Sequence, residues 1–209
     1  MIKAVLFDMD GVLIDAKDWH YEALNKALQL FGYEITRNDH LSTFDGLPTK
    51  VKLDIISQRY PLPAQLHSFI NEMKQIYTYE LVHALCKPRF QHEYALSKLK
   101  QLGYKTAVAS NSIRHTVELM MEKSNLKRFL DLQVSNEDVK NAKPSPEIYQ
   151  YCMSKFGLQP NECLVVEDNP NGIAAARASG AHVLEVAGVD DVSFAHIMNR
   201  IHSLESATQ

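Results

Sequence analysis

The sequence contains few cysteines, glycines and prolines, and it has no long apolar run. Three cysteines among 209 residues, none in a C-x-x-C pair, exclude a disulfide scaffold and favour a reducing compartment. Eight glycines and eight prolines exclude a collagen-like or low-complexity chain. No uncharged stretch reaches the roughly 20 apolar residues that span a bilayer, and the N-terminal apolar run stops at Asp8. We therefore expect a soluble, cytoplasmic protein with no membrane partner.

An excess of charge of one sign is also lacking. The 22 basic residues stand against 25 acidic residues, which gives a formal net charge of −3. The chain has no run of basic residues of the kind that forms a nucleic-acid-binding surface, so no nucleic-acid partner is expected. Hydrophobic residues make up 45% of the chain and charged residues 22%, as in ordinary globular proteins. Composition leaves the oligomeric state open.

Short apolar runs alternate with amphipathic helices along most of the chain, which is the pattern of an α/β fold with a parallel sheet. The runs lack strict alternation, so they suit strands that are covered on both faces. The expected strands are Ala4–Phe7, Lys105–Ala109, Leu130–Val134, Cys163–Val166 and His182–Val186. The expected helices lie at about 94–102, 113–123, 146–156, 170–179 and from 190 or 191 to about 203. Those at 94–102, 146–156 and 170–179 are each followed by glycine, and the last two begin with proline, as is usual at helix ends. The pattern predicts a Rossmann-like three-layer core.

The segment from about 16 to 85 breaks this alternation, because it carries only helical patterns. One apolar stripe ends at Gly32, and a long amphipathic stretch runs from Leu66 to Leu85. An all-helical insertion after the first strand predicts a second domain. We therefore expect a core made of residues 1–15 and 86–209 and a helical domain made of residues 16–85.

Two carboxylates, Asp8 and Asp10, stand at the end of the first expected strand and are followed by Gly11. Side chains two residues apart in an extended segment share a face, and parallel sheets bind ligands at the carboxyl ends of their strands. One such carboxylate can attack as a nucleophile while the other moves a proton. An ordinary acidic turn is the alternative interpretation of this motif alone.

Glu167 and Asp168 repeat this arrangement after the strand at 163–166 and before a helix that begins with Pro170. Two carboxylate pairs at one sheet edge concentrate negative charge, which a hard divalent cation balances. Mg²⁺ accepts both carboxylate and phosphate oxygens, so we expect it as the cofactor. A helix N-cap with an acidic neighbour is the alternative.

Ser110, Asn111 and Lys143 add groups that bind anions. Ser110 and Asn111 end a strand and open a helix, where hydroxyl and backbone N–H groups form an anion site, although both residues are also ordinary N-caps. A lysine beside carboxylates, such as Lys143, can neutralise a transferred phosphoryl group. Together the clusters describe a phosphoryl-transfer site.

These residues resemble the motifs of the haloacid dehalogenase superfamily, in order and across the whole chain. The D-x-D-G-V motif at Asp8–Val12 resembles the first motif of that family, Ser110 the second, Lys143 the third and Glu167-Asp168 the fourth. The stretches K-P-S-P-E-I-Y from Lys143 and E-D-N-P-N-G-I-A-A-A-R-A-S-G-A from Glu167 resemble the subgroup that contains beta-phosphoglucomutase and phosphoglycolate phosphatase.

The resemblance implies an aspartyl-phosphate mechanism. Asp8 would be the nucleophile, and Asp10 would protonate the leaving oxygen and then activate water. Mg²⁺ would be held by the Asp8 side chain, the Asp10 backbone carbonyl and Asp168, with Glu167 nearby.

The resemblance also implies that Ser110 and Lys143 bind the phosphoryl oxygens with help from Asn111, and that the inserted helices form a cap that opens for substrate. The expected activity is Mg²⁺-dependent hydrolysis of a small phosphomonoester (EC 3.1.3.-), such as a sugar phosphate.

Three residues of the expected cap, His20, Thr49 and Lys50, are candidate substrate contacts. Beta-phosphoglucomutases usually carry in the cap loop an arginine that grips a second phosphate. Thr49 stands at that place and Lys50 is only a possible substitute, which disfavours a mutase. A partly buried structural histidine is the alternative for His20.

Two other functions stay open. A phosphosugar mutase of the beta-phosphoglucomutase type is the alternative enzyme. A non-catalytic phospho-ligand-binding protein or receiver-like switch is the alternative of another class, although receivers carry their phosphorylated aspartate at a later strand and lack a helical insertion.

Overall fold

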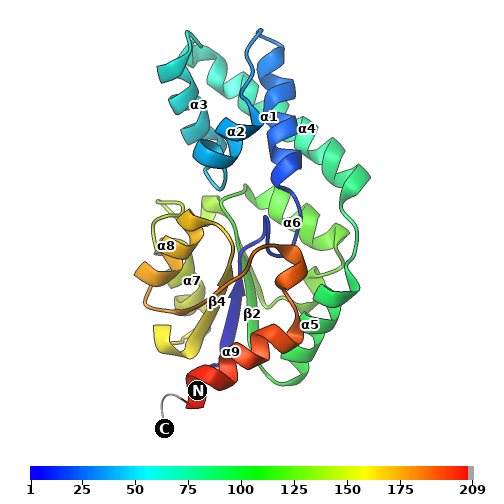
Figure 1. The fold of residues 1–209 in the computed structure, drawn as a ribbon, viewed down its shortest axis with the longest axis vertical. Helices are drawn as coiled ribbons and strands as arrows, with labels where there is room; N and C mark the ends of the chain where they lie inside the picture. The colour runs from blue at the N-terminus through cyan, green and yellow to red at the C-terminus, as the bar shows by residue number, and fades with distance from the viewer. Residues whose placement is uncertain (207–209) are drawn as a thin grey trace. The chain divides into compact units, whose positions relative to one another are not determined.

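The structure, a computed structural model, describes residues 1–206 (Figure 1). It separates into two compact units. One unit, called here the α/β unit, contains Met1–Asp15 and the chain from Lys87 onward. The other, the helical unit, is Ala16–Cys86. None of the helices between residues 1 and 206 is both long enough and apolar enough to cross a membrane.

Five parallel strands form the sheet of the α/β unit, in the order β3-β2-β1-β4-β5. They are β1 (Ala4–Phe7), β2 (Lys105–Ala109), β3 (Leu132–Val134), β4 (Cys163–Glu167) and β5 (His182–Glu185). The central strand β1 pairs with β2 on one side and β4 on the other, so Ala4 lies opposite both Lys105 and Cys163. Strand order reverses at β1, and the carboxyl ends of strands at such a point form a ligand-binding crevice. The predicted α/β fold is confirmed.

Helices cover both faces of this sheet. In Figure 1, α5 (Phe90–Gln101) and α9 (Phe194–Ser206) run along one side, and α7 (Glu147–Phe156) and α8 (Pro170–Ala178) lie on the other. Every residue of β1 and β4 is buried, which explains why these strands are apolar without alternation. The remaining long helix of the unit is α6 (Arg114–Lys123), and one-turn 3₁₀ helices lie at Lys127–Phe129, Asn136–Asp138, Pro160–Glu162 and Val189–Asp191.

Two of these single turns move boundaries that the sequence predicts. Strand β3 begins at Leu132 rather than Leu130, because Leu130 closes the 3₁₀ turn at Lys127–Phe129. Helix α9 begins at Phe194 rather than at 190 or 191, because those positions belong to the turn Val189–Asp191.

All three cysteines are buried and unbridged. Burial raises the pKa of Cys152 to about 12 and that of Cys163 to about 11, so these thiols stay protonated at neutral pH. They act as small apolar groups in the core.

The helical unit has its own apolar core. Its elements are α1 (Lys17–Gln29), α2 (Arg37–Asp39), a π-helical turn at His40–Phe44, α3 (Thr49–Arg59), a 3₁₀ turn at Ala64–Leu66 and α4 (His67–Leu85). The buried side chains that pack together in this core are Leu24, Ala27, Leu28, Ile35, Phe44, Leu53, Ile56, Leu62 and Ile70. The buried Asn25 side chain donates to the Ile35 carbonyl at 2.9 Å and accepts from the Ile35 N–H at 3.0 Å, which fixes the chain after α1.

Candidate active site

The turn after β1 carries the first carboxylate pair. The Asp8 N–H donates to the Val166 carbonyl at 3.0 Å, and Asp8 is only 8% exposed. Gly11 has φ 93°, a conformation that glycine adopts without strain, and its N–H donates to the Ile14 carbonyl at 2.7 Å. The chain therefore reverses directly after Asp10, which leaves both carboxylates at the carboxyl end of the central strand.

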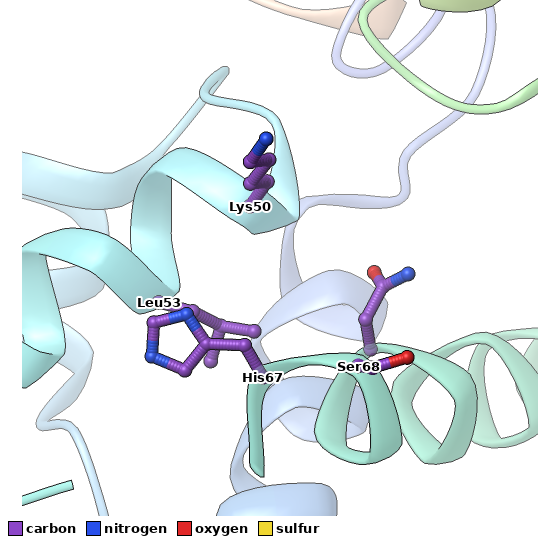
Figure 2. Close-up of a pocket in the computed structure, with 5 residues that line it drawn as sticks. Lys50, Leu53, His67 and Ser68 are labelled. Carbon is purple, nitrogen blue, oxygen red and sulfur yellow. The ribbon is translucent and has the colours of Figure 1, made fainter. Parts of the chain in front are cut away.

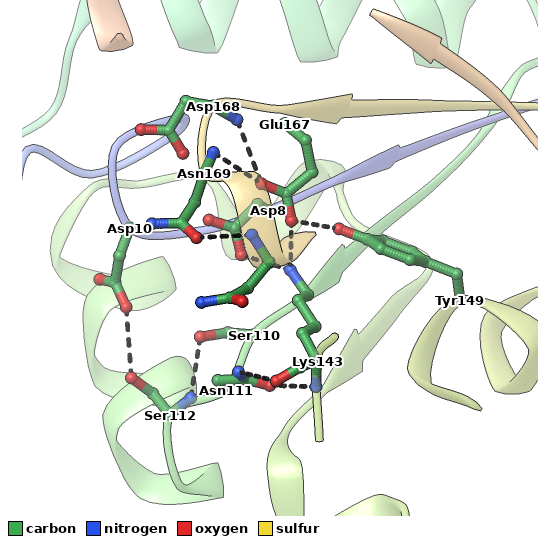
Figure 3. Close-up of polar contacts among 11 residues, drawn as sticks. Asp8, Asp10, Ser110, Asn111, Ser112, Lys143, Tyr149, Glu167, Asp168 and Asn169 are labelled. Carbon is green, nitrogen blue, oxygen red and sulfur yellow. Dashed lines mark hydrogen bonds and ion pairs between the residues drawn. The ribbon is translucent and has the colours of Figure 1, made fainter. Parts of the chain in front are cut away.

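Lys143 connects Asp8 to Glu167 (Figure 3). Its Nζ lies 2.6 Å from Asp8 Oδ1 and 2.7 Å from Glu167 Oε1, and the residue is 4% exposed. The Tyr149 hydroxyl donates to the same Glu167 oxygen at 2.6 Å. Hydrogen bonds between a buried ammonium and carboxylates are strong, so they hold the lysine at the edge of the Asp8 carboxylate.

Glu167 uses both of its oxygens inside the protein. Oε2 accepts the backbone N–H of Asp168 at 3.1 Å and that of Asn169 at 3.3 Å, while Oε1 accepts the two side-chain donors described above. Glu167 is completely buried, and a Cβ added at Gly172 would lie 1.8 Å from Oε1. These are the contacts of a supporting carboxylate that holds Lys143 and the start of α8.

Asp8, Glu167 and Asp168 each place a carboxylate oxygen within 4.8 Å of the others. Burial raises the pKa of Asp8 well above its ordinary 3.8, and the charge of Glu167 raises it further, while Lys143 lowers it. Burial lowers the pKa of Lys143, but Asp8 and Glu167 outweigh it, so that pKa ends above 10.5. The donors are hard oxygens that carry excess negative charge, so the site fits a divalent cation such as Mg²⁺.

Three residues after β2 approach this cluster. The buried Ser110 accepts the Ser112 N–H on its Oγ at 3.0 Å, and the Ser112 hydroxyl donates to Asp10 Oδ2 at 3.3 Å. The Asn111 side chain donates to the Lys143 carbonyl at 3.1 Å and accepts the Lys143 N–H at 2.9 Å. These bonds tie the loop after β2 both to the Asp10 turn and to the segment that carries Lys143.

The structure thus gathers in the α/β unit the residues that the sequence motifs single out. They are Asp8, Asp10, Ser110, Asn111, Lys143, Glu167 and Asp168 (Figure 3). It adds Ser112 and Tyr149, which the sequence reasoning did not assign. Tyr149 lies in the K-P-S-P-E-I-Y stretch, on the apolar face of a helix, where an aromatic residue is ordinarily interpreted as part of the hydrophobic core. Only its nearness to Lys143 in the sequence could have indicated a place in the site.

The remaining candidates, His20, Thr49 and Lys50, lie in the helical unit. His20 is buried, and its Nδ1 lies 3.3 Å from Nζ of the buried Lys74. Thr49 is the first residue of α3. Lys50 lines a hollow of about 250 Å³ together with Leu53, His67, Ser68 and Asn71 (Figure 2). Pockets for drug-sized ligands measure about 300–1,000 Å³, so this hollow suits a smaller molecule.

Four polar side chains line this hollow, namely Lys50, His67, Ser68 and Asn71. His67 is already bonded on both sides, because its Nε2 lies 2.6 Å from Ser57 Oγ and its Nδ1 lies 3.4 Å from Asp54 Oδ1. Lys50, Ser68 and Asn71 therefore supply the charge and the hydrogen-bonding groups that a molecule in the hollow would meet.

Comparison with known proteins identifies the family. A family model described as haloacid dehalogenase-like hydrolase matches residues 5–186. The chain belongs to this family. This haloacid dehalogenase-like hydrolase is 29% identical over 182 residues to a phosphorylated carbohydrates phosphatase of Thermotoga maritima, covering 86% of this chain and 82% of that protein. It is 28% identical over 178 residues to hexitol phosphatase B of Escherichia coli, covering 85% of this chain and 80% of that protein.

Solved structures of similar proteins share the fold of this haloacid dehalogenase-like hydrolase. A beta-phosphoglucomutase from Clostridium difficile has a TM-score of 0.85 and 23% identity, with both chains covered completely. CbbY from Rhodobacter sphaeroides, in complex with phosphate, has a TM-score of 0.79 and 23% identity, covering 93% of this chain and 91% of that one. The resemblance stated from the four motifs is confirmed, and the protein is an enzyme of this hydrolase family.

Proposed function

We propose that this enzyme is a Mg²⁺-dependent phosphatase of a small phosphorylated metabolite, such as a sugar phosphate or a polyol phosphate. The observation that carries the proposal is the buried Lys143 ammonium, which joins Asp8 to Glu167 beside Asp168. Phosphoryl transfer needs a positioned nucleophile and fixed positive charge. Asp8 supplies the nucleophile, and Lys143 supplies part of the positive charge. Two similar proteins named as phosphatases of phosphorylated carbohydrates and hexitols support the substrate class.

In the proposed reaction, an Asp8 carboxylate oxygen attacks phosphorus, and the bond from phosphorus to the ester oxygen breaks. Asp10 gives its proton to that oxygen, so the alcohol leaves and an aspartyl-phosphate remains. Asp10 then takes a proton from water, whose oxygen attacks phosphorus. The bond to Asp8 breaks, and inorganic phosphate leaves. Lys143 and Ser110 hydrogen-bond to the phosphoryl oxygens, and Asn111 fixes the backbone of Lys143.

The proposed ligands of Mg²⁺ are the side chains of Asp8 and Asp168 and the backbone carbonyl of Asp10. When bound, the ion supplies positive charge that offsets the phosphoryl charge. Glu167 belongs to the same carboxylate cluster, and its hydrogen bonds keep Lys143 in place.

The test is phosphate release from a panel of sugar and polyol phosphates, with Mg²⁺ and with EDTA. We expect metal-dependent release that is abolished in Asp8→Asn and retained in Asp18→Asn. Asp18 is the matched control, because its half-exposed carboxylate pairs with a surface arginine, Arg37, in the helical unit. Wild-type turnover in Asp8→Asn would disprove the nucleophile assignment.

The product separates this proposal from its alternatives. ³¹P NMR of the reaction mixture should show free phosphate as the product. An isomeric sugar phosphate would indicate a phosphosugar mutase instead. Binding without turnover of any compound in the panel would indicate a non-catalytic protein.

His20, Thr49 and Lys50 are the proposed substrate contacts of the helical unit. Lys50→Met removes the positive charge from the hollow of Figure 2 and keeps most of the side-chain length. We expect a higher KM for the best substrate with little change in kcat. Lys123→Met, at an exposed position on α6, is the charge-matched control. An unchanged KM would remove Lys50 from the substrate site.

A further inference from the structure

His92 on α5 is a buried histidine whose two ring nitrogens both face backbone carbonyls. Nδ1 lies 3.1 Å from the Leu13 oxygen and Nε2 lies 2.8 Å from the Val189 oxygen, and the residue is 1% exposed. Leu13 belongs to the turn that carries Asp10, and Val189 opens the single helical turn before α9. His92 therefore joins two loops that are far apart in the sequence.

The number of ring protons decides how many of these contacts are hydrogen bonds. A neutral imidazole has one N–H, and a backbone carbonyl can only accept. With the proton on Nε2, the shorter contact to Val189 is a hydrogen bond, and Nδ1 turns a lone pair toward the Leu13 oxygen. Only the imidazolium form donates to both carbonyls. The interaction between His92 Nδ1 and the Leu13 carbonyl is therefore weak in this neutral form and strong in the charged form.

Two charged groups face the ring from the elements around it. Arg89 precedes α5, Asp190 lies in the turn Val189–Asp191, and the two form an ion pair at 2.6 Å. Burial lowers the pKa of His92 below its ordinary 6.5, and Arg89 lowers it further, against the opposing effects of Val189, Leu13 and Asp190. The ring is therefore neutral at neutral pH and gains its second proton only in acid.

The turn that His92 contacts is held by backbone hydrogen bonds of its own and by the Ser112 hydroxyl, which donates to Asp10. The N–H groups of Leu13 and Ile14 donate to the Met9 carbonyl at 2.9 and 2.8 Å, and the Gly11 N–H donates to Ile14. These bonds set the curvature of the turn, whereas donation from the doubly protonated His92 ring to the Leu13 carbonyl holds the turn against α5. Asp10 lies inside this turn, so a displacement of Leu13 moves Asp10 as well.

We propose that His92 is a positioning residue for Asp10. The ring holds the Leu13 turn against α5, and its hydrogen bond to the Leu13 carbonyl is strongest when both ring nitrogens are protonated. The kinetic part of this inference rests on the proposed phosphatase reaction. The structural part does not, because the ring contacts and the turn can be observed without turnover.

The kinetic test compares two variants of His92 with a matched control. His92→Leu removes both contacts. At a pH low enough for the wild-type ring to carry two protons, we expect kcat to fall at least tenfold while KM changes less than twofold, because a misplaced proton-transfer group slows the chemistry rather than substrate binding. His92→Gln retains an N–H₂ donor and should keep kcat within about threefold of wild type at neutral pH.

Gln91→Leu is the control for stability. Gln91 Nε2 donates to the carbonyls of Asp190 and Val192, both at 2.9 Å, so it stabilises the loop before α9 through hydrogen bonds that do not involve Leu13. We expect Gln91→Leu to lower the melting temperature and leave kcat unchanged. If His92→Leu loses no more activity than Gln91→Leu, His92 has only a structural role and the proposal fails.

The spectroscopic test is ¹⁵N NMR of the ring in the full-length wild-type protein. We expect the Nε2–H form at pH 8, both nitrogens protonated in acid, and amide signals of Gly11 and Ile14 that titrate together with the ring. In the pH profile, the ratio of wild-type kcat to that of His92→Gln should rise as the ring gains its proton. Two results would overturn the proposal: a proton on Nδ1 at pH 8, or amide signals of Gly11 and Ile14 whose chemical shifts do not titrate with the ring. Absence of phosphatase activity in the wild type would instead refute the proposed function, and the NMR result would still stand.

Discussion

The side-chain amide of Asn111 pairs with both polar groups of the Lys143 backbone. Its Nδ2 donates to the Lys143 carbonyl at 3.1 Å, and its Oδ1 accepts the Lys143 N–H at 2.9 Å. Asparagine suits this pairing because one side chain offers a donor and an acceptor next to each other. The segment before α7 is thereby fastened to the end of β2, and the lysine ammonium is aimed at Asp8.

Replacing this amide with a carboxylate should disturb the lysine. In Asn111→Asp, an acceptor faces the Lys143 carbonyl where a donor stood, so we expect kcat/KM to fall ten- to a hundredfold. The free energy of unfolding should fall by about 1–3 kcal/mol, the usual penalty for an unsatisfied buried partner. Steady-state kinetics and urea denaturation measure the two effects. Asn199→Asp, at an exposed position on α9, is the control, and equal losses in both variants would contradict the role of the pairing.

Tyr149→Phe removes one hydroxyl and keeps the ring that lies under the lysine. The Lys143 Nζ stands 4.8 Å from the ring centroid, so the aromatic contact remains. Glu167 Oε1 loses one of its two side-chain donors, and we expect about 1–3 kcal/mol less stability in urea denaturation. Tyr151→Phe, on the same helix, should change stability by less than about 0.5 kcal/mol. A Tyr149→Phe protein as stable as wild type would show that the hydroxyl does not support Glu167.

Gly172→Ala should disrupt the site through a single methyl group. The new Cβ would lie 1.8 Å from Glu167 Oε1, so either the buried carboxylate or the first turn of α8 has to move. Because that carboxylate binds Lys143, we expect loss of activity together with a drop of several kcal/mol in stability, as for other buried charge contacts that are broken. Gly188→Ala is the matched control, since nothing lies within 4 Å of a Cβ built there. A Gly172→Ala enzyme with normal kcat would show that the carboxylate can shift freely.

His40 makes the stability of the helical unit depend on pH. Burial, aided by the charge of Lys52, lowers the pKa of His40 from 6.5 to about 4. Below pH 6.5 the unfolded chain gains a proton that the folded chain lacks, so the free energy of unfolding falls as pH drops toward 4, by about 3 kcal/mol in total. His40→Phe has no titrating group and should lose correspondingly less stability between pH 7 and pH 4, as measured by urea denaturation at each pH. His202→Phe, at an exposed position on α9, should retain the wild-type slope, and an unchanged slope in His40→Phe would refute this account.

Much of the fold could be predicted because its strands are apolar throughout and its helices carry clear end signals. The bounds of β1 and β2 match the predicted runs, since charged residues or the start of the next motif end them sharply. The order of the strands was not predicted, because five short runs of similar composition carry no mark of which neighbour each one pairs with. The start of β3 was wrong by two residues, because an apolar Leu130 reads as strand although it closes a helical turn.

Part of the candidate site could likewise be predicted from the sequence, and part could not. The spacing of Asp8 and Asp10 predicted two carboxylates at the sheet edge, and parallel strands place them there. The resemblance to the family distinguished Asp168 from Glu167, but the residue pattern alone could not, because only the folded chain shows that Glu167 is enclosed by Lys143, Tyr149 and backbone N–H groups. His92 was missed because a histidine on an amphipathic helix carries no signal of the carbonyls that it will face.

The central place of β1 in the sheet has a consequence for synthesis of the chain. Ala4–Phe7 is translated before the other strands, since β2 begins about 100 residues later and β4 begins at Cys163. The helical unit is continuous in sequence and has its own core, so all of its residues leave the ribosome while the apolar β1 segment still lacks both of its neighbours. A nascent chain that has not yet reached Lys105 therefore carries the apolar β1 segment without either of the strands that it pairs with in the folded sheet.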